Sequence, residues 1–364
     1  MHILVTADTV GGVWSYTREL VSGLAARGVR VTLVSFGGVP RRDQRAWLAA
    51  LPEVEYYPTA FRLEWMEECT KDLVDSAAYL LRIIAESKPD LLHLSQFCYG
   101  ALTTDLPKVV VAHSDVFTWH EVVRGRAPYG EWAHWYRHTV QSGLAGASVV
   151  VAPSRWMAAR FRQCYESPAV RVIYNGRSPL LFDAFQRKQE IAASAGRLWD
   201  EGKQTSMLRS LGCAMPIYVA GSMSLSGADE VGRDDESDGV VFCGELGEAQ
   251  MSELLGRAAI YVATSKYEPF GLSPLEAALS RCALVLNDIP SLREIWGDAA
   301  MYFRRDDAAS LRDVLDGLHS APRIRREYGE RAYRHALANY SADAMVGEYL
   351  QMYSTLLERQ ASAA

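Results

Sequence analysis

Short apolar runs rich in β-branched residues alternate with longer helical patterns along this chain of 364 residues. Parallel strands that are buried on both faces read as continuous apolar runs, and helices form the crossovers between them. The alternation therefore predicts an α/β fold with parallel sheets. The predicted strands span residues 3–5, 29–36, 91–94, 109–112 and 148–152 in the first half, and 217–220, 240–243, 260–263 and 283–286 in the second half.

Length and composition favour two domains. Because 49% of the residues are hydrophobic, a chain of this length can bury two separate cores. The turn-rich stretch from Asn175 to Pro179 separates the two sets of strands. Ligands of open α/β sheets bind at the carboxyl ends of the strands, so the expected site of a two-domain version is the cleft between the domains. We place a Rossmann-like domain at residues 1–177, a linker at 178–189, a second Rossmann-like domain at 190–340 and a final helix at 341–364.

Composition also excludes several classes of protein. The formal net charge of −6 argues against a nucleic-acid surface, which usually carries a basic excess. The six cysteines lie far apart without a Cys-x-x-Cys pair, so neither a zinc site nor a disulfide framework is indicated. The chain begins with a strand pattern, and no apolar run approaches the roughly 20 residues that cross a bilayer. We expect a cytoplasmic protein, with peripheral contact to the inner face of the membrane left open.

One loop in the second half has the features of an anion site. Glu268 follows the apolar run 259–263, and Gly271 lets the backbone approach a ligand closely. Ser273 and Glu276 have the spacing of a capping box, which predicts that a helix begins at Ser273. Backbone N–H groups at such a helix start favour a bound anion.

Two cations could meet the same anion. Arg197 and Lys203 lie six residues apart after a strand candidate of small residues, and together they could stabilise a diphosphate. The alternative is that these cations are solvated and that the carboxylates only cap a helix. Ser291 and Glu294 repeat the capping pattern with no ligand implied.

A paired glycine stands near the start of the chain. Gly11-Gly12 precedes a helical pattern over 13–27, so its backbone could approach a phosphate or a sugar. The Gly-x-Gly-x-x-Gly spacing is missing, which disfavours a nicotinamide dehydrogenase. A plain tight turn is the alternative.

The stretch from Glu268 to Leu272, together with Glu276, resembles the E-x7-E signature of the retaining family-4 glycosyltransferases. This resemblance implies the GT-B fold, in which two Rossmann-like domains face each other across a cleft and the C-terminal helix crosses back. Further stretches resemble the family in the expected order along nearly the whole chain: 1–36, 89–94, 109–113, 151–154, 172–176 and 196–203.

The resemblance also implies roles for individual residues. Arg197 and Lys203 match the cations on the donor diphosphate, Glu268 the carboxylate beside the donor sugar, and Glu276 the ligand of the ribose hydroxyls. His113 matches a histidine beside the donor sugar, so the implied catalytic set is His113, Arg197, Lys203 and Glu268. No metal and no cofactor is implied beyond the nucleotide sugar. The implied donor-binding residues are Gly11, Gly12, Asn175, Ser222, Gly244, Glu245, Leu246, Phe270, Gly271, Leu272, Ser273 and Glu276.

The implied reaction moves a hexose from a nucleoside diphosphate sugar to a hydroxyl of a sugar, glycolipid or small molecule, with retention, in polysaccharide or glycoconjugate synthesis. A GT-B nucleotide-sugar epimerase and an inactive sugar-nucleotide-binding subunit are the alternatives. Uridine, guanosine and adenosine donors all stay open. Arg177-Ser178 and Gln204 depart from the common family pattern and leave the subfamily open.

The acceptor side is expected in a segment of rings and cations at 119–138. Aromatic faces stack on sugars, so Trp119, His120 and Tyr129 are the acceptor candidates. Basic-aromatic helices also touch membranes, and an ordinary interdomain face is a further alternative. His134 and His138 lack the glutamate of a zinc motif, so we predict no metal there.

Overall fold

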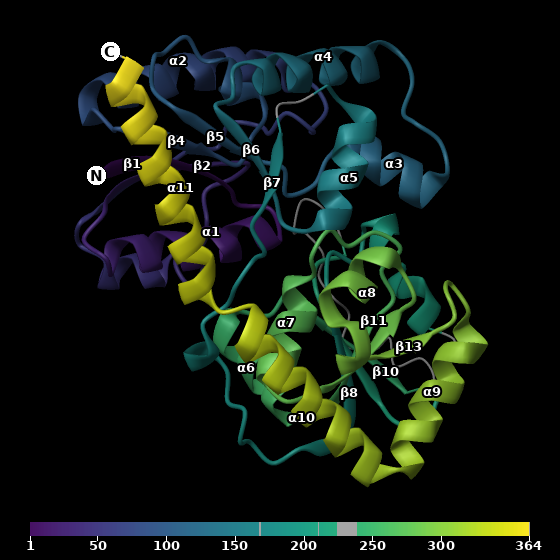
Figure 1. The fold of residues 1–364 in the computed structure, drawn as a ribbon. Helices are drawn as coiled ribbons and strands as arrows, with labels where there is room; N and C mark the ends of the chain where they lie inside the picture. The colour runs from purple at the N-terminus through teal and green to yellow at the C-terminus, as the bar shows by residue number, and fades with distance from the viewer. Residues whose placement is uncertain (167–168, 210, 224–238, 364) are drawn as a thin grey trace. The chain divides into compact units, whose positions relative to one another are not determined.

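The computed structural model describes residues 1–166, 169–209, 211–223 and 239–363 (Figure 1). The chain divides into two compact units. The first comprises Met1–Gly176 with Ala342–Ala364, and the second comprises Arg177–Ser341. Residues 178–189 therefore belong to the second unit. The sequence of residues 227–239 is acidic and lacks a strand pattern, which predicts an exposed loop, and residues 227–238 of it lie outside the described residues.

A seven-stranded parallel sheet forms the centre of the first unit, in the order β3-β2-β1-β4-β5-β6-β7. Most residues of its inner strands are apolar and buried because helices cover both faces. The strands are β1 (His2–Asp8), β2 (Arg30–Phe36), β3 (Val54–Pro58), β4 (Leu91–Leu94), β5 (Lys108–Val111), β6 (Val149–Ala152) and β7 (Val170–Val172). The helices are α1 (Gly12–Ala25), α2 (Thr70–Ser87), α3 (Val116–Arg124), α4 (Glu131–Ala145), α5 (Arg155–Cys164) and α11 (Ala342–Ala363).

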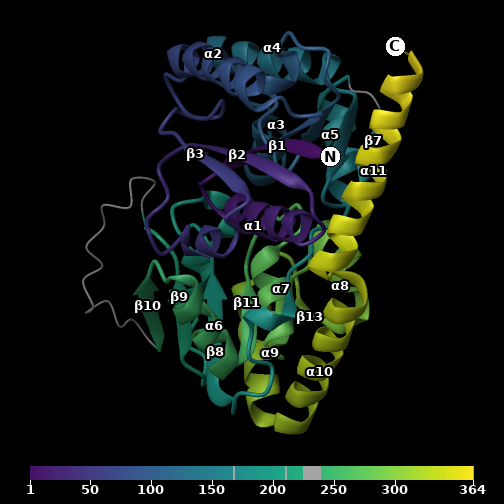
Figure 2. The same ribbon diagram turned by 90° about the vertical axis from the view of Figure 1, so that its left-hand side faces the viewer.

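The last helix, α11, packs on the first unit although it follows the second in the sequence. It lies alongside α1 in both views (Figures 1 and 2). Gly23 of α1 allows this close approach, because a Cβ at that position would lie 2.6 Å from Val346 Cγ2. Tyr353 of α11 is buried and its hydroxyl lies 2.7 Å from Nδ1 of the buried His93 on β4. The C-terminal helix is therefore part of the core of the first unit.

The second unit has a six-stranded parallel sheet in the order β10-β9-β8-β11-β12-β13. Its strands are β8 (Gln189–Ala195), β9 (Ile217–Ala220), β10 (Val240–Gly244), β11 (Ala258–Ala263), β12 (Ala283–Asn287) and β13 (Met301–Phe303). Its helices are α6 (Glu248–Arg257), α7 (Leu272–Leu279), α8 (Pro290–Trp296), α9 (Ala308–Ser320) and α10 (Pro322–Asn339). In the part of the chain that the structure describes, no helix is long and apolar enough to cross a membrane.

The predicted fold class of two Rossmann-like α/β domains is confirmed. Three strands escaped prediction, namely β3, β7 and β13, and all three stand at the edges of their sheets. An edge strand has one neighbour only and is partly exposed, as the residues of β3 and β7 are. Such strands lack the continuous apolar run by which the central strands were found.

Candidate functional site

The loop that follows β11 leads directly into α7. Gly271 is the N-cap of this helix, with φ 93° and ψ 78°, and Leu272 is its first residue. The prediction that Ser273 caps the helix and that Glu276 completes a capping box is wrong, because no side chain caps α7. Only glycine adopts this left-handed conformation without strain, so the glycine determines where the helix begins.

Glu268 in this loop forms an ion pair with Lys203. Its Oε2 lies 2.5 Å from Lys203 Nζ and accepts a hydrogen bond of 3.1 Å from Ser265 Oγ. The side chains of Glu268 and Lys203 are 13% and 18% exposed, so the pair is partly shielded from water. Thr264 Oγ1 donates to Lys203 O at 2.8 Å, which joins the lysine turn to the loop.

Arg197 is held in a similar way. Its Nη2 lies 2.7 Å from Oδ2 of the buried Asp200, and its guanidinium stands 5.2 Å from the Trp199 ring centroid. Asp200 Oδ1 also accepts a hydrogen bond from Gly202 N. A Cβ on Gly196, the residue before Arg197, would lie 3.3 Å from Lys203 Cδ, so the stem of the lysine passes beside this turn. Both cations therefore belong to the same turn after β8, and each is held by its own carboxylate.

Close backbone approach brings two more predicted donor residues to this edge. A Cβ on Gly221 would lie only 1.8 Å from Gly196 O, so only glycine fits there. Leu198 N then donates to Ser222 O at 2.9 Å, and Gly221 N donates to Gly244 O at 2.8 Å. The structure thus gathers Arg197, Lys203, Ser222, Gly244 and Glu268 at the carboxyl ends of β8, β9, β10 and β11, with Glu245 and Leu246 directly after β10.

Glu276 has a partner that the sequence reasoning missed. Arg177 Nη2 lies 3.0 Å from Glu276 Oε1, and the two side chains are 4% and 13% exposed. The signal was present, since Arg177 directly follows the Asn-Gly turn and departs from the family pattern. Ser265 was also missed, although it precedes Glu268 by three residues.

The aromatic residue of the same loop is anchored as well. The ring of Phe270 packs edge to face on Tyr340, with centroids 5.4 Å apart. Tyr340 stands one residue before the end of the second unit.

In the first unit, the predicted residues also lie at carboxyl ends of strands. Gly11 is the N-cap of α1, with φ 81°, and Gly12 is the first helical residue. One turn later, the ring of Tyr16 packs at 4.5 Å from that of His113, which follows β5. His113 Nε2 lies 3.4 Å from Ser95 Oγ. Asn175 is buried three residues after β7.

Burial lowers the pKa of His113 to about 3. It also lowers the pKa of His93, the neighbour of Tyr16, to about 3. Both imidazoles are therefore neutral near pH 7. His113 can exchange hydrogen bonds at this edge but carries no charge there.

The acceptor candidates lie elsewhere in the first unit. Trp119 and His120 stand on α3 with rings 5.1 Å apart, and Tyr129, in the turn before α4, is 79% exposed. Arginines stack on both of the larger rings: Arg124 on Trp119 at 5.1 Å and Arg126 on Tyr129 at 5.4 Å.

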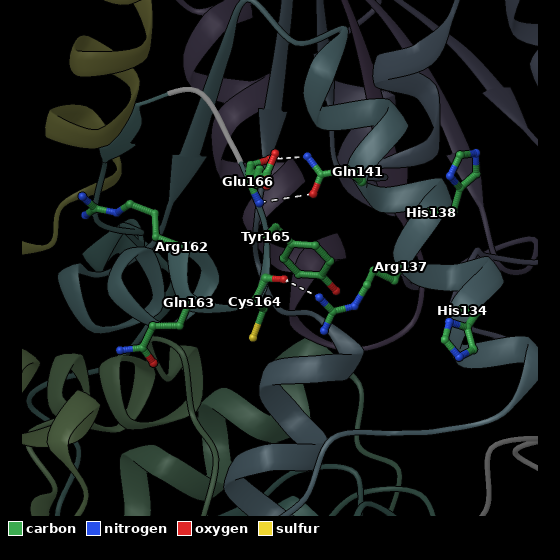
Figure 3. A pocket seen from close by; sticks show the side chains of 9 residues that line it. All are labelled: His134, Arg137, His138, Gln141, Arg162, Gln163, Cys164, Tyr165 and Glu166. Carbon is green, nitrogen blue, oxygen red and sulfur yellow. Dashed lines mark hydrogen bonds between the residues drawn. The ribbon is translucent and has the colours of Figure 1, made fainter.

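A pocket of about 940 Å³ opens between α4 and the end of α5 (Figure 3). Arg137 on its wall donates to Cys164 O at 3.1 Å and stacks on Phe117 at 4.3 Å. None of the three acceptor candidates lines this pocket. Its lining residues are His134, Arg137, His138, Gln141, Arg162, Gln163, Cys164, Tyr165 and Glu166.

Within the described ranges, no group of three or more histidine, cysteine or acidic residues could hold a metal ion.

Two family models match the chain, one in each half. Residues 10–179 match Glycosyltransferase Family 4, and residues 234–335 match Glycosyl transferases group 1. The chain is 31% identical over 123 residues to the lipopolysaccharide core biosynthesis mannosyltransferase LpcC of Rhizobium leguminosarum bv. viciae. That match covers 33% of this chain and spans only about a third, 34%, of the relative.

Solved structures resemble the whole chain. Sucrose-phosphate synthase from Thermosynechococcus elongatus superposes with a TM-score of 0.80 at 17% identity, covering 99% of this chain and 100% of the other. Anabaena HepE, solved in complex with UDP and glucose, superposes with a TM-score of 0.74 at 14% identity, covering 98% and 100%. At these identities the likeness shows the fold. The chain therefore has the GT-B fold, and each of its halves matches a glycosyltransferase family model.

Proposed function

We propose that this protein transfers a hexose from a nucleoside diphosphate sugar to a hydroxyl acceptor, with retention and without a metal ion. The observation that carries the proposal is the cluster at the carboxyl edge of the second sheet. There, Lys203 and Arg197 lie in one turn after β8, while Glu268 and Glu276 lie in the loop after β11 and in α7. Two cations suit a diphosphate, and two carboxylates suit the hydroxyls of a sugar and a ribose.

The paired cations are preorganised for this task. Glu268 holds Lys203 and Asp200 holds Arg197, so neither side chain has to be ordered when a diphosphate arrives. Lys203 Nζ can donate to a phosphate oxygen once Glu268 turns to a sugar hydroxyl. Arg197 is 38% exposed, which leaves part of its guanidinium accessible.

In the proposed reaction, the bond between the anomeric carbon and the diphosphate oxygen breaks through an oxocarbenium-like state. The acceptor oxygen attacks on the face that the diphosphate leaves, and its proton passes to the departing phosphate oxygen. Arg197 and Lys203 stabilise the charge that grows on that oxygen. His113, neutral at physiological pH, contributes a hydrogen bond rather than a charge.

The relatives suggest the substrate class. LpcC is a mannosyltransferase of lipopolysaccharide core synthesis, and the HepE structure holds UDP and glucose. We propose a hexose donor of this kind and a glycan or glycolipid acceptor.

Calorimetry tests the donor part of the proposal. Purified protein is titrated with the UDP, GDP and ADP forms of glucose and mannose in the presence of EDTA. We expect one nucleotide series to bind, because no step of the proposed reaction needs a metal. Binding only after a divalent ion is added would overturn the metal-free mechanism, and no binding at all would overturn the donor assignment. Conversion of the donor sugar without an acceptor would instead identify an epimerase.

A further inference from the structure

Arg177 is a buried arginine directly beside a carboxylate of the proposed donor site. Its side chain is 4% exposed, and its guanidinium carbon lies 5.5 Å from the ring centroid of Phe182. Its Nη2 lies 3.0 Å from Glu276 Oε1 and 4.0 Å from Glu248 Oε1. Glu248 is 46% exposed, whereas Glu276 is 13% exposed. The shorter and better shielded contact is the one with Glu276, so that pair is the stronger.

The backbone of Arg177 is held in place as well. Its N–H donates to Tyr340 O at 3.1 Å, and it forms an isolated parallel bridge with Ser341. Tyr340 is anchored in turn, since its hydroxyl donates to Ile295 O at 2.8 Å. The guanidinium therefore projects from a fixed backbone position.

Arg177 and Tyr340, the two residues of this backbone contact, both support the loop after β11 and the helix α7 that follows it. Arg177 holds Glu276 on α7, and Tyr340 packs on Phe270 in the loop before it. Arg177 is also the first residue of the second unit, and Ser341 is its last. The segment at which the chain enters and leaves this unit is thus built into the support of the proposed donor site.

We propose that Arg177 is a positioning residue that orients the Glu276 carboxylate toward the ribose hydroxyls of the donor. The proposal rests on the proposed function. A charge-assisted bond to Oε1 fixes the plane of the carboxylate, and the direction of the second oxygen follows from it. Without the guanidinium, a mostly buried carboxylate loses its counter-charge and its orientation together.

Ribose-deleted nucleotides separate this role from a general structural one. The probes are UDP, GDP and ADP with their 2′,3′-dideoxy counterparts, and the dissociation constants are measured by calorimetry. The wild type is expected to bind one ribonucleotide about tenfold or more tighter than its dideoxy form, as a hydrogen bond to a charged group would give. An Arg177→Met variant should lose this preference and bind both forms with similar affinity. Arg177→Lys should retain part of it, since it keeps the charge but not the planar fork.

Arg325 offers a matched control in the same unit. Its side chain is 8% exposed and its Nη2 lies 2.5 Å from Glu190 Oε1, at the start of β8 and so away from the carboxyl edge. Arg325→Met should lower stability yet leave the ribose preference unchanged. A thermal melt of each variant checks that it is folded. If Arg177→Met does not fold, Arg177→Lys is used for the test in its place.

The failures are distinguishable. If the wild type binds no nucleotide, both the proposed function and the proposed role of Arg177 are overturned. If the wild type binds and Arg177→Met keeps the full ribose preference, only the positioning role is overturned. A preference lost equally in Arg325→Met would assign the effect to general destabilisation and would also overturn it.

Discussion

At the scale of single residues, the site consists of cations that are already held by carboxylates. Lys203 pairs with Glu268, Arg197 with Asp200, and Arg177 with Glu276. Such pairs contribute little net stability, because desolvation offsets much of the attraction. Their value lies in orientation, since each charged group is in place before a ligand arrives.

Glu268→Gln tests the catalytic carboxylate. The amide keeps the size of the side chain and can still accept hydrogen bonds from Ser265 and Lys203. We expect sugar transfer to fall by about 100-fold or more, because stabilisation of the reacting sugar is lost, while the melting temperature changes little. Initial rates with the donor found by calorimetry give the measurement. Glu253→Gln, an exposed change on α6, should retain full activity. Equal rates for the wild type and Glu268→Gln would remove Glu268 from the mechanism.

His113 gives a pH-dependent prediction. Its pKa is about 3 in the folded state, against 6.5 for a histidine in the unfolded chain, so the unfolded chain binds the additional proton between these pH values. The stability that the neutral imidazole provides is therefore present above pH 6.5 and is lost as the pH falls toward 3. The free energy of unfolding of the wild type, relative to His113→Gln, should decrease from pH 7 to pH 5. Urea titrations at several pH values measure it, and a constant difference would contradict the burial of a neutral His113.

At the scale of elements, Gly271 determines where α7 begins. Gly271 has φ 93°, and a Cβ there would lie 3.2 Å from Glu268 Cγ and 3.3 Å from Pro274 Cγ. The second capping pattern, at Ser291 and Glu294, also forms no side-chain cap, since α8 begins at Pro290. Local spacing of polar residues thus predicted the start of α7 wrongly.

Gly271→Ala should destabilise the protein by about 1–2 kcal/mol, the usual cost of a left-handed conformation with a Cβ. It should also weaken donor binding, because the added methyl group displaces Glu268. Gly317→Ala on α9 is the matched control: no atom lies within 4 Å of its Cβ position, and alanine favours a helix. Denaturation and nucleotide titration of both variants decide the matter. Similar stability and affinity in the two would mean that Gly271 is not required.

At the scale of the whole molecule, α11 completes the core of the first unit after the chain has passed through the second. The Tyr353 hydroxyl lies 2.7 Å from His93 Nδ1, and that of Tyr16 lies 3.1 Å from His93 Nε2. Helices from the two ends of the chain therefore meet at one buried imidazole.

Tyr353→Phe removes one partner of this imidazole and leaves a buried nitrogen unsatisfied. We expect a loss of about 1–3 kcal/mol of stability. Gln351→Ala, on the exposed face of the same helix, should cost far less. Scanning calorimetry compares the two, and an unchanged melting temperature for Tyr353→Phe would show that the hydrogen bond does not hold α11.

The sequence alone determined the α/β class, the central strands and the carboxyl-edge positions of Arg197, Lys203 and Glu268. Buried parallel strands need apolar runs, and that requirement is visible locally. Three of the four edge strands, β3, β7 and β13, were not visible, because partial exposure relaxes the same requirement. Only the tertiary structure decided which side chains meet. Lys203 pairs with Glu268 65 residues away. Arg177 contacts Glu276 because the segment by which the chain enters the second unit packs against α7 of that unit. The spacing of residues along the sequence does not indicate such long-range contacts.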